Sequence, residues 1–385
     1  MLAGRGGTFD RRVPVWLSPP LDSKFPALLA VNQELARGQV SVEFHRLVDL
    51  LVGQLGEQLR ALDACIVHNA ASLHFNLPLT AALATLARRG GICPIIAWCH
   101  DLSWVNPLYT PHLHQGEPWS LLKTPLPGVT YVVVSEDRRG DLTRLFAESG
   151  AQSIPEISVV PAGVDVDRKL QLRPATRELA AQLSLLDHHP FMLLPVRITK
   201  RKNIELAIRV TRALRDLGMR PLLLVTGPPG PHNVRSVDYV DELIAERRAQ
   251  DVEREVVLLF EQRRPSGGPW RASDGMMDDL YQLADLMLIP SAQEGFGIPL
   301  LEAGLVRLPI FCSDIPPFQE IGGPSVHTFG LDESPRSIAS RIQRHLAEDS
   351  PGRLRRQVLC QYSWDSVFDR LIRPLLPRRP ADDRD

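Results

Sequence analysis

Residues 286–302, with the sequence LMLIPSAQEGFGIPLLE, decide the fold. The first four residues are uniformly apolar, as in a parallel strand that is buried on both faces. Pro299 suits the first turn of a following helix, because its missing N–H would have no partner there. Gly295 and Gly297 allow a sharp turn and a close backbone approach to a ligand. A strand, a glycine turn and a helix in this order predict an anion site at the start of the helix.

The rest of the chain repeats this alternation of short apolar runs and longer amphipathic segments, which is typical of βαβ units with parallel sheets. At 385 residues the chain exceeds what one hydrophobic core usually covers, so we expect an α/β fold with two domains. Strands are predicted at Val13–Leu17, Ala64–His68, Pro94–Trp98, Val129–Val134, Ile157–Val160, Phe191–Val196, Pro221–Val225, Glu255–Phe260, Leu286–Ile289 and Leu308–Cys312. Helices are predicted at Ile204–Leu217 and Tyr239–Arg248.

A polar, proline-bearing segment near the middle of the chain marks the domain junction. It predicts an N-terminal domain of residues 1–175 and a C-terminal domain of residues 176–362. Residues 363–375 have helical spacing, and the Pro- and Arg-rich tail 376–385 is expected to be disordered.

The bulk composition excludes several classes of protein. Lys and Arg number 44 against 45 Asp and Glu, so no polyelectrolyte charge points to a nucleic-acid partner. Five scattered cysteines fit reduced thiols rather than a disulfide framework or a zinc site. The N-terminus lacks a signal-peptide core, and no apolar run approaches the ~18 residues that span a bilayer. We therefore expect a cytoplasmic protein.

Two carboxylates, Glu294 and Glu302, flank the glycine turn. Carboxylates accept hydroxyl hydrogen bonds well, so one could hold a sugar and the other a ribose. The alternative is that Glu302 only complements the helix dipole and Glu294 is a solvated loop residue.

Four cations follow the predicted strand that ends at Val196, namely Arg197, Lys200, Arg201 and Lys202. They stand at the carboxyl end of a strand, where open α/β sheets bind ligands, and a diphosphate is their natural partner. The alternative is a solvated basic turn.

Taken together, these residues resemble the retaining glycosyltransferases of GT-B fold, in particular glycosyltransferase family 4. The family's motif E-G-F-G-x-P-x-x-E stands in full from Glu294 to Glu302. The resemblance covers roughly residues 60 to 375 and implies two Rossmann-like domains that face across a cleft. Other similar elements are Val134–Glu136, Pro161–Asp165, Thr226–Gly230, Ser313–Glu320 and a terminal helix with Trp364 that would cross back to the N-terminal domain.

The resemblance also implies roles for single residues. Arg197 and Lys202 would bind the donor diphosphate, Glu294 the donor-sugar hydroxyls and Glu302 the nucleotide ribose. His100 would face the donor sugar, although a lone His is also a common packing or capping residue; Asn69 is a weaker candidate for the same cleft, with a loop-capping role as its alternative. The remaining donor-binding candidates are the backbone of Gly295, Phe296 and Gly297, together with Gly227.

The implied reaction moves a sugar from a nucleotide diphosphate sugar to an unidentified acceptor, with retention of anomeric configuration. The acceptor could be a carbohydrate, a lipid-linked molecule or another small molecule, and peripheral membrane contact stays open. We expect no cofactor and no essential metal. The Asp165-Val-Asp167 run is interpreted as a turn with solvated acids rather than a metal site.

The opening of the chain departs from the family pattern. The family begins with a strand, a Gly-rich turn and a long helix, whereas Gly4, Gly6 and Gly7 have no predicted strand before them. The N-terminal domain is therefore expected to be incomplete, which leaves a non-catalytic sugar-nucleotide-binding protein or a truncated inactive enzyme as alternatives. An NAD-dependent oxidoreductase would need G-x-G-x-x-G after an early strand, and the sequence has no such unit.

Overall fold

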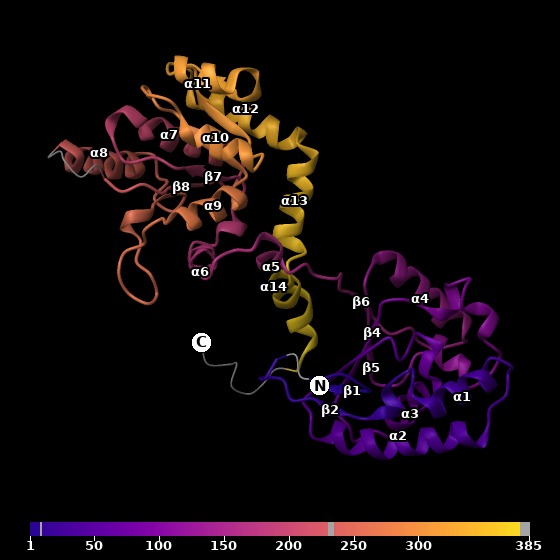
Figure 1. Ribbon diagram of the computed structural model, residues 1–385. Coiled ribbons are helices and arrows are strands. Elements are labelled where there is room, and N and C mark those ends of the chain that lie inside the picture. The colour runs from indigo at the N-terminus through magenta and orange to yellow at the C-terminus, as the bar shows by residue number, and fades with distance from the viewer. Residues whose placement is uncertain (8–9, 230–234, 378–385) are drawn as a thin grey trace. The chain divides into compact units, whose positions relative to one another are not determined.

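The computed structural model describes residues 1–7, 10–229 and 235–377, which divide into two compact units (Figure 1). The first unit comprises residues 1–163 together with those from 365 onward, and the second comprises residues 164–364. The predicted junction at residue 175 therefore differs from the observed one at Gly163. The reason is that α6 (Pro174–Gln182) already packs against α9 (Asp274–Leu283) of the second unit. From residue 378 onward, the predicted disordered tail lies outside the described residues.

The second unit contains a parallel sheet of six strands in the order β12-β11-β10-β7-β8-β9. Counted from β7, this is the 3-2-1-4-5-6 order of a Rossmann fold. Five of the six strands, all but β12, consist of residues that are buried along their whole length, as expected for a sheet covered on both faces. The strands are β7 (Phe191–Leu194), β8 (Leu222–Val225), β9 (Val256–Leu258), β10 (Leu286–Ile289), β11 (Ile310–Ser313) and β12 (His327–Phe329).

Helices surround β7 and β8 in this unit (Figure 1). Among them, α7 and α12 pack against each other, and both bury apolar residues at helical spacing. Besides α6 and α9, the helices of the unit are α5 (Val166–Leu170), α7 (Ile204–Asp216), α8 (Arg235–Ala249), α10 (Ile298–Leu305), α11 (Pro316–Gly322), α12 (Pro335–Glu348) and α13 (Ser350–Gln361).

The first unit contains a parallel sheet of four strands in the order β3-β4-β5-β6. Helices α2 and α3 lie side by side in this unit (Figure 1). The strands are β3 (Cys65–His68), β4 (Ile95–Cys99), β5 (Val129–Val133) and β6 (Ile157–Val159). The helices are α1 (Pro26–Leu35), α2 (Val42–Arg60), α3 (Leu77–Arg89) and α4 (Glu136–Glu148).

The C-terminal segment packs against the sheet of the first unit. The side chain of Val367 is fully buried against Ile96, Trp98 and Val132. The helix predicted for residues 363–375 is present without a break from Trp364 to Leu375, but its type changes along the chain: α14 (Trp364–Val367), a π-helix at Phe368–Ile372 and a 3-10 helix at Arg373–Leu375. Pro374 has no N–H to continue a regular helix, which accounts for the last change of type.

The N-terminal residues form a separate two-stranded parallel sheet of β1 (Leu2–Ala3) and β2 (Trp16–Leu17). The five-residue strand predicted at Val13–Leu17 is therefore wrong in length, because Pro14 has no N–H for a ladder and its carbonyl accepts from the amino terminus of Met1 at 2.6 Å. A strand does precede Gly4, contrary to expectation. The absence of the family's first βα unit stays a prediction.

The predicted α/β class, with parallel sheets in both units, is confirmed. Strand β10 has the predicted bounds, whereas β12 was not predicted. The arrangement of the two units across a cleft stays a prediction. None of the helices in the described part of the chain is long and apolar enough to cross a bilayer.

Candidate functional site

The candidate site of the second unit begins where the strand order reverses, between β7 and β10. Open α/β sheets bind ligands outside the carboxyl ends of the strands at this point. The loop after β7 carries the four predicted cations, and the loop after β10 carries Glu294. The two strands pair directly, so both loops emerge from adjacent strands at the same edge of the sheet.

Glu294 makes three side-chain contacts, and two of them join the two loops. Its Oε1 pairs with Nζ of Lys202 and accepts a hydrogen bond from Ser291 Oγ at 2.8 Å. Its Oε2 lies 3.2 Å from Nη1 of Arg201. The Glu294 and Lys202 side chains are each only 11% exposed. Glu294 is therefore not a solvated loop residue, and the structure brings it together with Lys202 as one ion pair.

The other cations of the loop differ in how they are held. Arg201 also donates to the carbonyl of Gln293 at 3.1 Å. Lys200 pairs with Glu205 at 3.1 Å and with Glu242, and its hydrogen bond to Glu242 contributes most to raising the pKa of Lys200. Arg197 is exposed and has no ion-pair partner among the described residues. Of the four cations, Arg197 is thus the one whose charge no acid of the described chain compensates.

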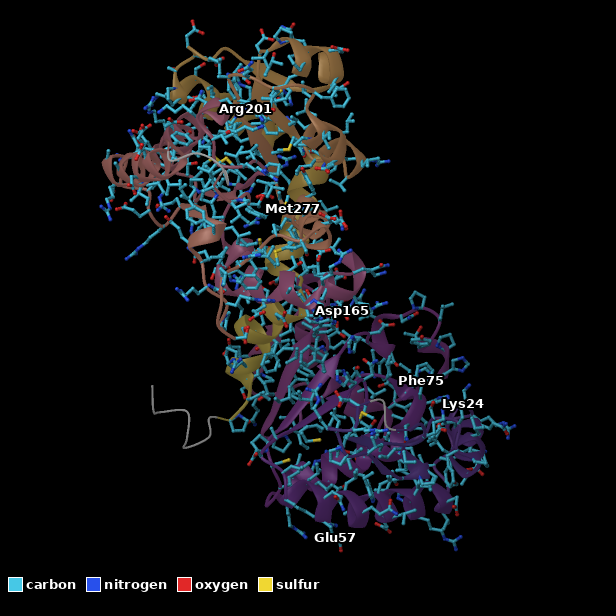
Figure 2. All side chains as sticks on the ribbon, turned by 60° about the vertical axis from the view of Figure 1, so that its left-hand side comes forward. Lys24, Glu57, Phe75, Asp165, Arg201 and Met277 are labelled. Atoms are coloured by element: carbon cyan, nitrogen blue, oxygen red, sulfur yellow. The ribbon has the colours of Figure 1, made fainter. Side chains whose placement is uncertain are left out.

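A pocket of about 820 Å³ opens beside Arg197. This volume lies in the range of small-molecule sites. Of the predicted residues, it is lined by Arg197, Gly227 and Glu302, while Glu294 and Lys202 lie outside its lining. Phe260, Trp270, Met277 and Leu305 supply apolar walls. Figure 2 labels Arg201 from the ion-pair cluster and Met277 from this pocket.

Tyr281 holds Glu302 in the pocket wall, a contact that the sequence did not reveal. The Tyr281 hydroxyl donates to Oε2 of Glu302 at 2.7 Å. Burial, followed by this hydrogen bond, raises the pKa of Tyr281, so the hydroxyl keeps its proton at neutral pH. The two residues come from different helices, α9 and α10, and no local spacing connects them. Glu302 is therefore held in a fixed orientation by a side-chain contact, so complementing the helix dipole is not its only interaction.

The three glycines near the site have different surroundings. A Cβ on Gly227 would lie 2.2 Å from the carbonyl oxygen of Val196 and 2.7 Å from Cα of Arg197, so only glycine lets these backbones meet. Gly297 has a φ of +119° at the start of α10, which also favours glycine. Apart from Gly295 itself and its two chain neighbours, no described residue has an atom within 4 Å of a Cβ built on Gly295. The side chain of Phe296, next to it, is exposed.

This contrast predicts different outcomes for two alanine substitutions. Gly227→Ala should lower the stability of the second unit by about 1–3 kcal/mol, because the added methyl group overpacks the backbone that positions Arg197. Gly295→Ala, the matched control, should unfold at the wild-type temperature because its methyl group enters open space. Thermal unfolding of both variants checks this, and equal melting temperatures for the two would contradict it.

His100 belongs to the first unit and follows β4. Its Nε2 lies 3.0 Å from Nδ1 of His68, and its backbone N–H donates to Oδ1 of Asn69 at 2.8 Å. Burial, and to a lesser degree the nearby His100, lowers the pKa of His68. Asn69 adopts a positive φ of 60°, which asparagine tolerates, and it fixes the loop that carries His100. These contacts support the loop-capping interpretation of Asn69.

The two acids of the Asp165-Val-Asp167 run have structural partners. Asp165 caps α5 by accepting from the N–H of Arg168 at 2.9 Å. Asp167 pairs with Arg177 at 3.3 Å. Within residues 1–7, 10–229 and 235–377, no three His, Cys, Asp or Glu side chains are grouped so that they could hold a metal ion.

The glycosyl transferases group 1 family matches residues 175–358, which include both the ion-pair cluster and the pocket. These residues are a glycosyl transferases group 1 domain. The motifs of this domain indicated Arg197, Arg201, Lys202, Glu294 and Glu302. They did not indicate the contacts by which Arg201, Ser291 and Tyr281 hold the two carboxylates.

Curated relatives that are similar to this chain are named as glycosyltransferases. The D-inositol 3-phosphate glycosyltransferase of Actinosynnema mirum is 29% identical over 256 residues, which cover 63% of this chain and 56% of the relative. The protein of the same name from Saccharomonospora viridis is 25% identical over 342 residues, which cover 83% and 75%. The chain spans about half the length of the relatives from Actinosynnema mirum and Nocardia farcinica.

Two solved structures also align with the chain. Sucrose-phosphate synthase from Thermosynechococcus elongatus is 17% identical, with 87% of this chain and 80% of that chain covered and a TM-score of 0.36. Anabaena HepE in complex with UDP and glucose is 17% identical, with 84% and 80% covered and a TM-score of 0.37.

Proposed function

We propose that the protein is a retaining glycosyltransferase of family 4 that uses a nucleotide diphosphate sugar as donor. The observation that carries the proposal is the pocket at the carboxyl edge of the sheet, with the uncompensated Arg197 in its wall and the Glu294–Lys202 pair in the loops of the switch point. An anion with an apolar or aromatic body suits such a pocket, since cationic and apolar groups line it together.

The donor would be bound in three parts. The nucleoside occupies the pocket, where Trp270 and Met277 contact the base and the oriented carboxylate of Glu302 accepts from the ribose hydroxyls. Arg197 and Lys202 bind the diphosphate, with the backbone N–H groups of residues 295–297 as further donors. Glu294 accepts from the sugar hydroxyls. In the absence of donor, Glu294 neutralises Lys202, so a diphosphate would share that cation with it.

The chemistry proposed for this site is a substitution at the anomeric carbon. The bond between that carbon and the diphosphate oxygen breaks, and the bond to the acceptor oxygen forms on the same face of the sugar. The acceptor hydroxyl gives its proton to the departing phosphate oxygen. Negative charge grows on the diphosphate in the transition state, and fixed cations aimed at that charge lower the barrier. His100 is proposed as a contact of the donor sugar on the strength of the family resemblance.

We further propose that the reaction needs neither a metal nor a cofactor, since cationic side chains supply the charge that a metal would bring. The acceptor is a carbohydrate, a lipid-linked molecule or another small molecule. The protein would act in the cytoplasm, with peripheral membrane contact if the acceptor is lipid-linked.

A dinucleotide-dependent oxidoreductase fits the site less well. In the Rossmann strand order, the glycine-rich fingerprint follows the first strand, which is β7 here. Residues 195–203 after β7 read PVRITKRKN and contain no glycine. This turn is therefore basic, whereas a dinucleotide-binding fold needs glycines there so that the backbone can approach the pyrophosphate closely.

The test is a transfer assay with purified protein, a panel of UDP-, GDP- and ADP-sugars, and pooled acceptors in buffer with EDTA. We expect acceptor-dependent release of nucleotide from one donor, and a product whose anomeric configuration, read from its NMR coupling constant, equals that of the donor. Inverted product would overturn retention, and loss of activity in EDTA would overturn metal independence. Donor binding without release under all acceptors would favour the non-catalytic alternative.

A further inference from the structure

A second cavity, of about 470 Å³, lies at the opposite edge of the same sheet. Its walls include His189 just before β7, Asp285 just before β10 and Pro309 just before β11, which are the amino ends of three parallel strands. Arg307 and the first turn of α13 also line this cavity. No part of the proposed donor chemistry uses this cavity.

Three arginines line this cavity: Arg307, Arg353 and Arg355. Nη2 of Arg355 is buried and has no hydrogen-bond partner among the described residues. Arg307 has no ion-pair partner among them either, whereas Arg353 donates to Ser350 Oγ at 3.0 Å. A buried polar group without a partner costs stability, and a water molecule or an ion is one of the partners that such groups have in native proteins.

The acids of the cavity are already engaged. Asp285 accepts from the N–H of Phe191 at 2.7 Å, lies 3.2 Å from Nδ1 of His189 and stands 3.8 Å from Arg356. Asp349 accepts from the N–H of Gly352 at 3.1 Å as the cap of α13. Burial lowers the pKa of Arg355, and Arg356 lowers it further against the opposing effect of Asp285. The cavity thus offers guanidinium donors whose charge the neighbouring acids leave incompletely satisfied.

We propose that this cavity binds the phosphate group of a small soluble molecule between Arg307 and Arg355. Guanidinium groups bind phosphate oxygens in a bidentate geometry, and two or three of them around one group suit its charge. Leu308 and Leu346 line the same cavity and give the rest of the ligand an apolar wall. The volume is in the range of small-molecule sites and exceeds what a bare phosphate fills.

The second cavity shares part of its wall with the pocket proposed for the donor. Tyr281, Gln282 and Val306 line both. The cations differ, because Arg197 lines only the first cavity and Arg307 and Arg355 only the second. Substitutions of these arginines therefore separate the two sites, whether or not the protein proves to be a glycosyltransferase.

The test uses the full chain in phosphate-free buffer and inorganic phosphate as the probe, with sodium chloride matched for ionic strength. Thermal unfolding and isothermal titration are measured for wild type, Arg355→Met, Arg307→Gln and Arg197→Ala. We expect millimolar phosphate to raise the melting temperature of wild type and of Arg197→Ala by several degrees. Arg355→Met should fold without phosphate, because it removes an unpartnered buried cation, and its phosphate affinity should fall at least tenfold.

Arg307→Gln is the second variant, since its exposed side chain can be changed without loss of the fold, and its phosphate affinity should also fall severalfold. A phosphate response that survives both Arg355→Met and Arg307→Gln would overturn the proposal. So would a response that only Arg197→Ala removes, because phosphate would then occupy the donor pocket. No response of the wild-type protein at 10-fold higher phosphate, on the order of tens of millimolar, would overturn it as well.

Discussion

Arg197→Ala is expected to leave the fold intact and to lower sugar transfer about 10²- to 10³-fold. The side chain is exposed and has no ion-pair partner among the described residues, so its loss should change the stability by no more than about 0.5 kcal/mol. Its proposed partner is the diphosphate, whose negative charge grows as the sugar leaves. The measurement is the rate of nucleotide release at saturating acceptor, with thermal unfolding in parallel.

Arg248→Ala is the matched control for this substitution. Arg248 is an exposed arginine of α8 and lines neither cavity. It should keep wild-type transfer and wild-type stability. Wild-type transfer by Arg197→Ala would remove Arg197 from the mechanism.

Glu294→Gln is expected to have the largest effect on stability. The side chain of its partner Lys202 is 11% exposed, and the substitution leaves that ammonium group without its carboxylate. Breaking one side of a buried pair costs about 3–5 kcal/mol, and the residual exposure of this pair places the expected loss near 3 kcal/mol. At about 2–4 °C per kcal/mol for a unit of this size, the melting temperature should fall clearly. Donor affinity should fall with it, because Glu294 is the proposed partner of the sugar hydroxyls.

A double substitution separates the two consequences. Glu294→Gln with Lys202→Met removes both members of the pair and should recover much of the stability, because no unpaired charge stays buried. It should not recover transfer, since both proposed donor contacts are gone. Additive losses of stability in the double variant would show that the pair is not coupled, contrary to the structure.

The strands of the second unit were predictable where both faces are buried. Leu286–Ile289 is uniformly apolar, and the structure gives β10 those bounds. The strand predicted at Leu308–Cys312 begins later, at Ile310, because Pro309 has no N–H and Leu308 donates its own to Ala303 of the preceding helix. Strand β12 is only three residues, His327–Phe329, too short and too polar for an apolar pattern.

The candidate site was predictable only as far as local motifs reach. Glu294, Glu302 and the basic loop stand in recognisable local motifs, so their spacing indicated an anion site. The contacts that orient the two glutamates were not predictable in this way. Tyr281 on one helix contacts Glu302 on another, and Arg201 on one loop contacts Glu294 on another. Such pairings depend on the strand order, and nothing in the spacing of the residues encodes it. The close approach of Gly227 to Val196 has the same origin.

The most direct measurement of the central claim is isothermal titration of the purified protein with UDP-, GDP- and ADP-sugars in buffer with EDTA. The account predicts that one of these donors binds to a single site, and that Arg197→Ala weakens its binding while Arg248→Ala does not. The absence of binding by every sugar nucleotide, or binding that Arg197→Ala leaves unchanged, would contradict the assignment of the donor site.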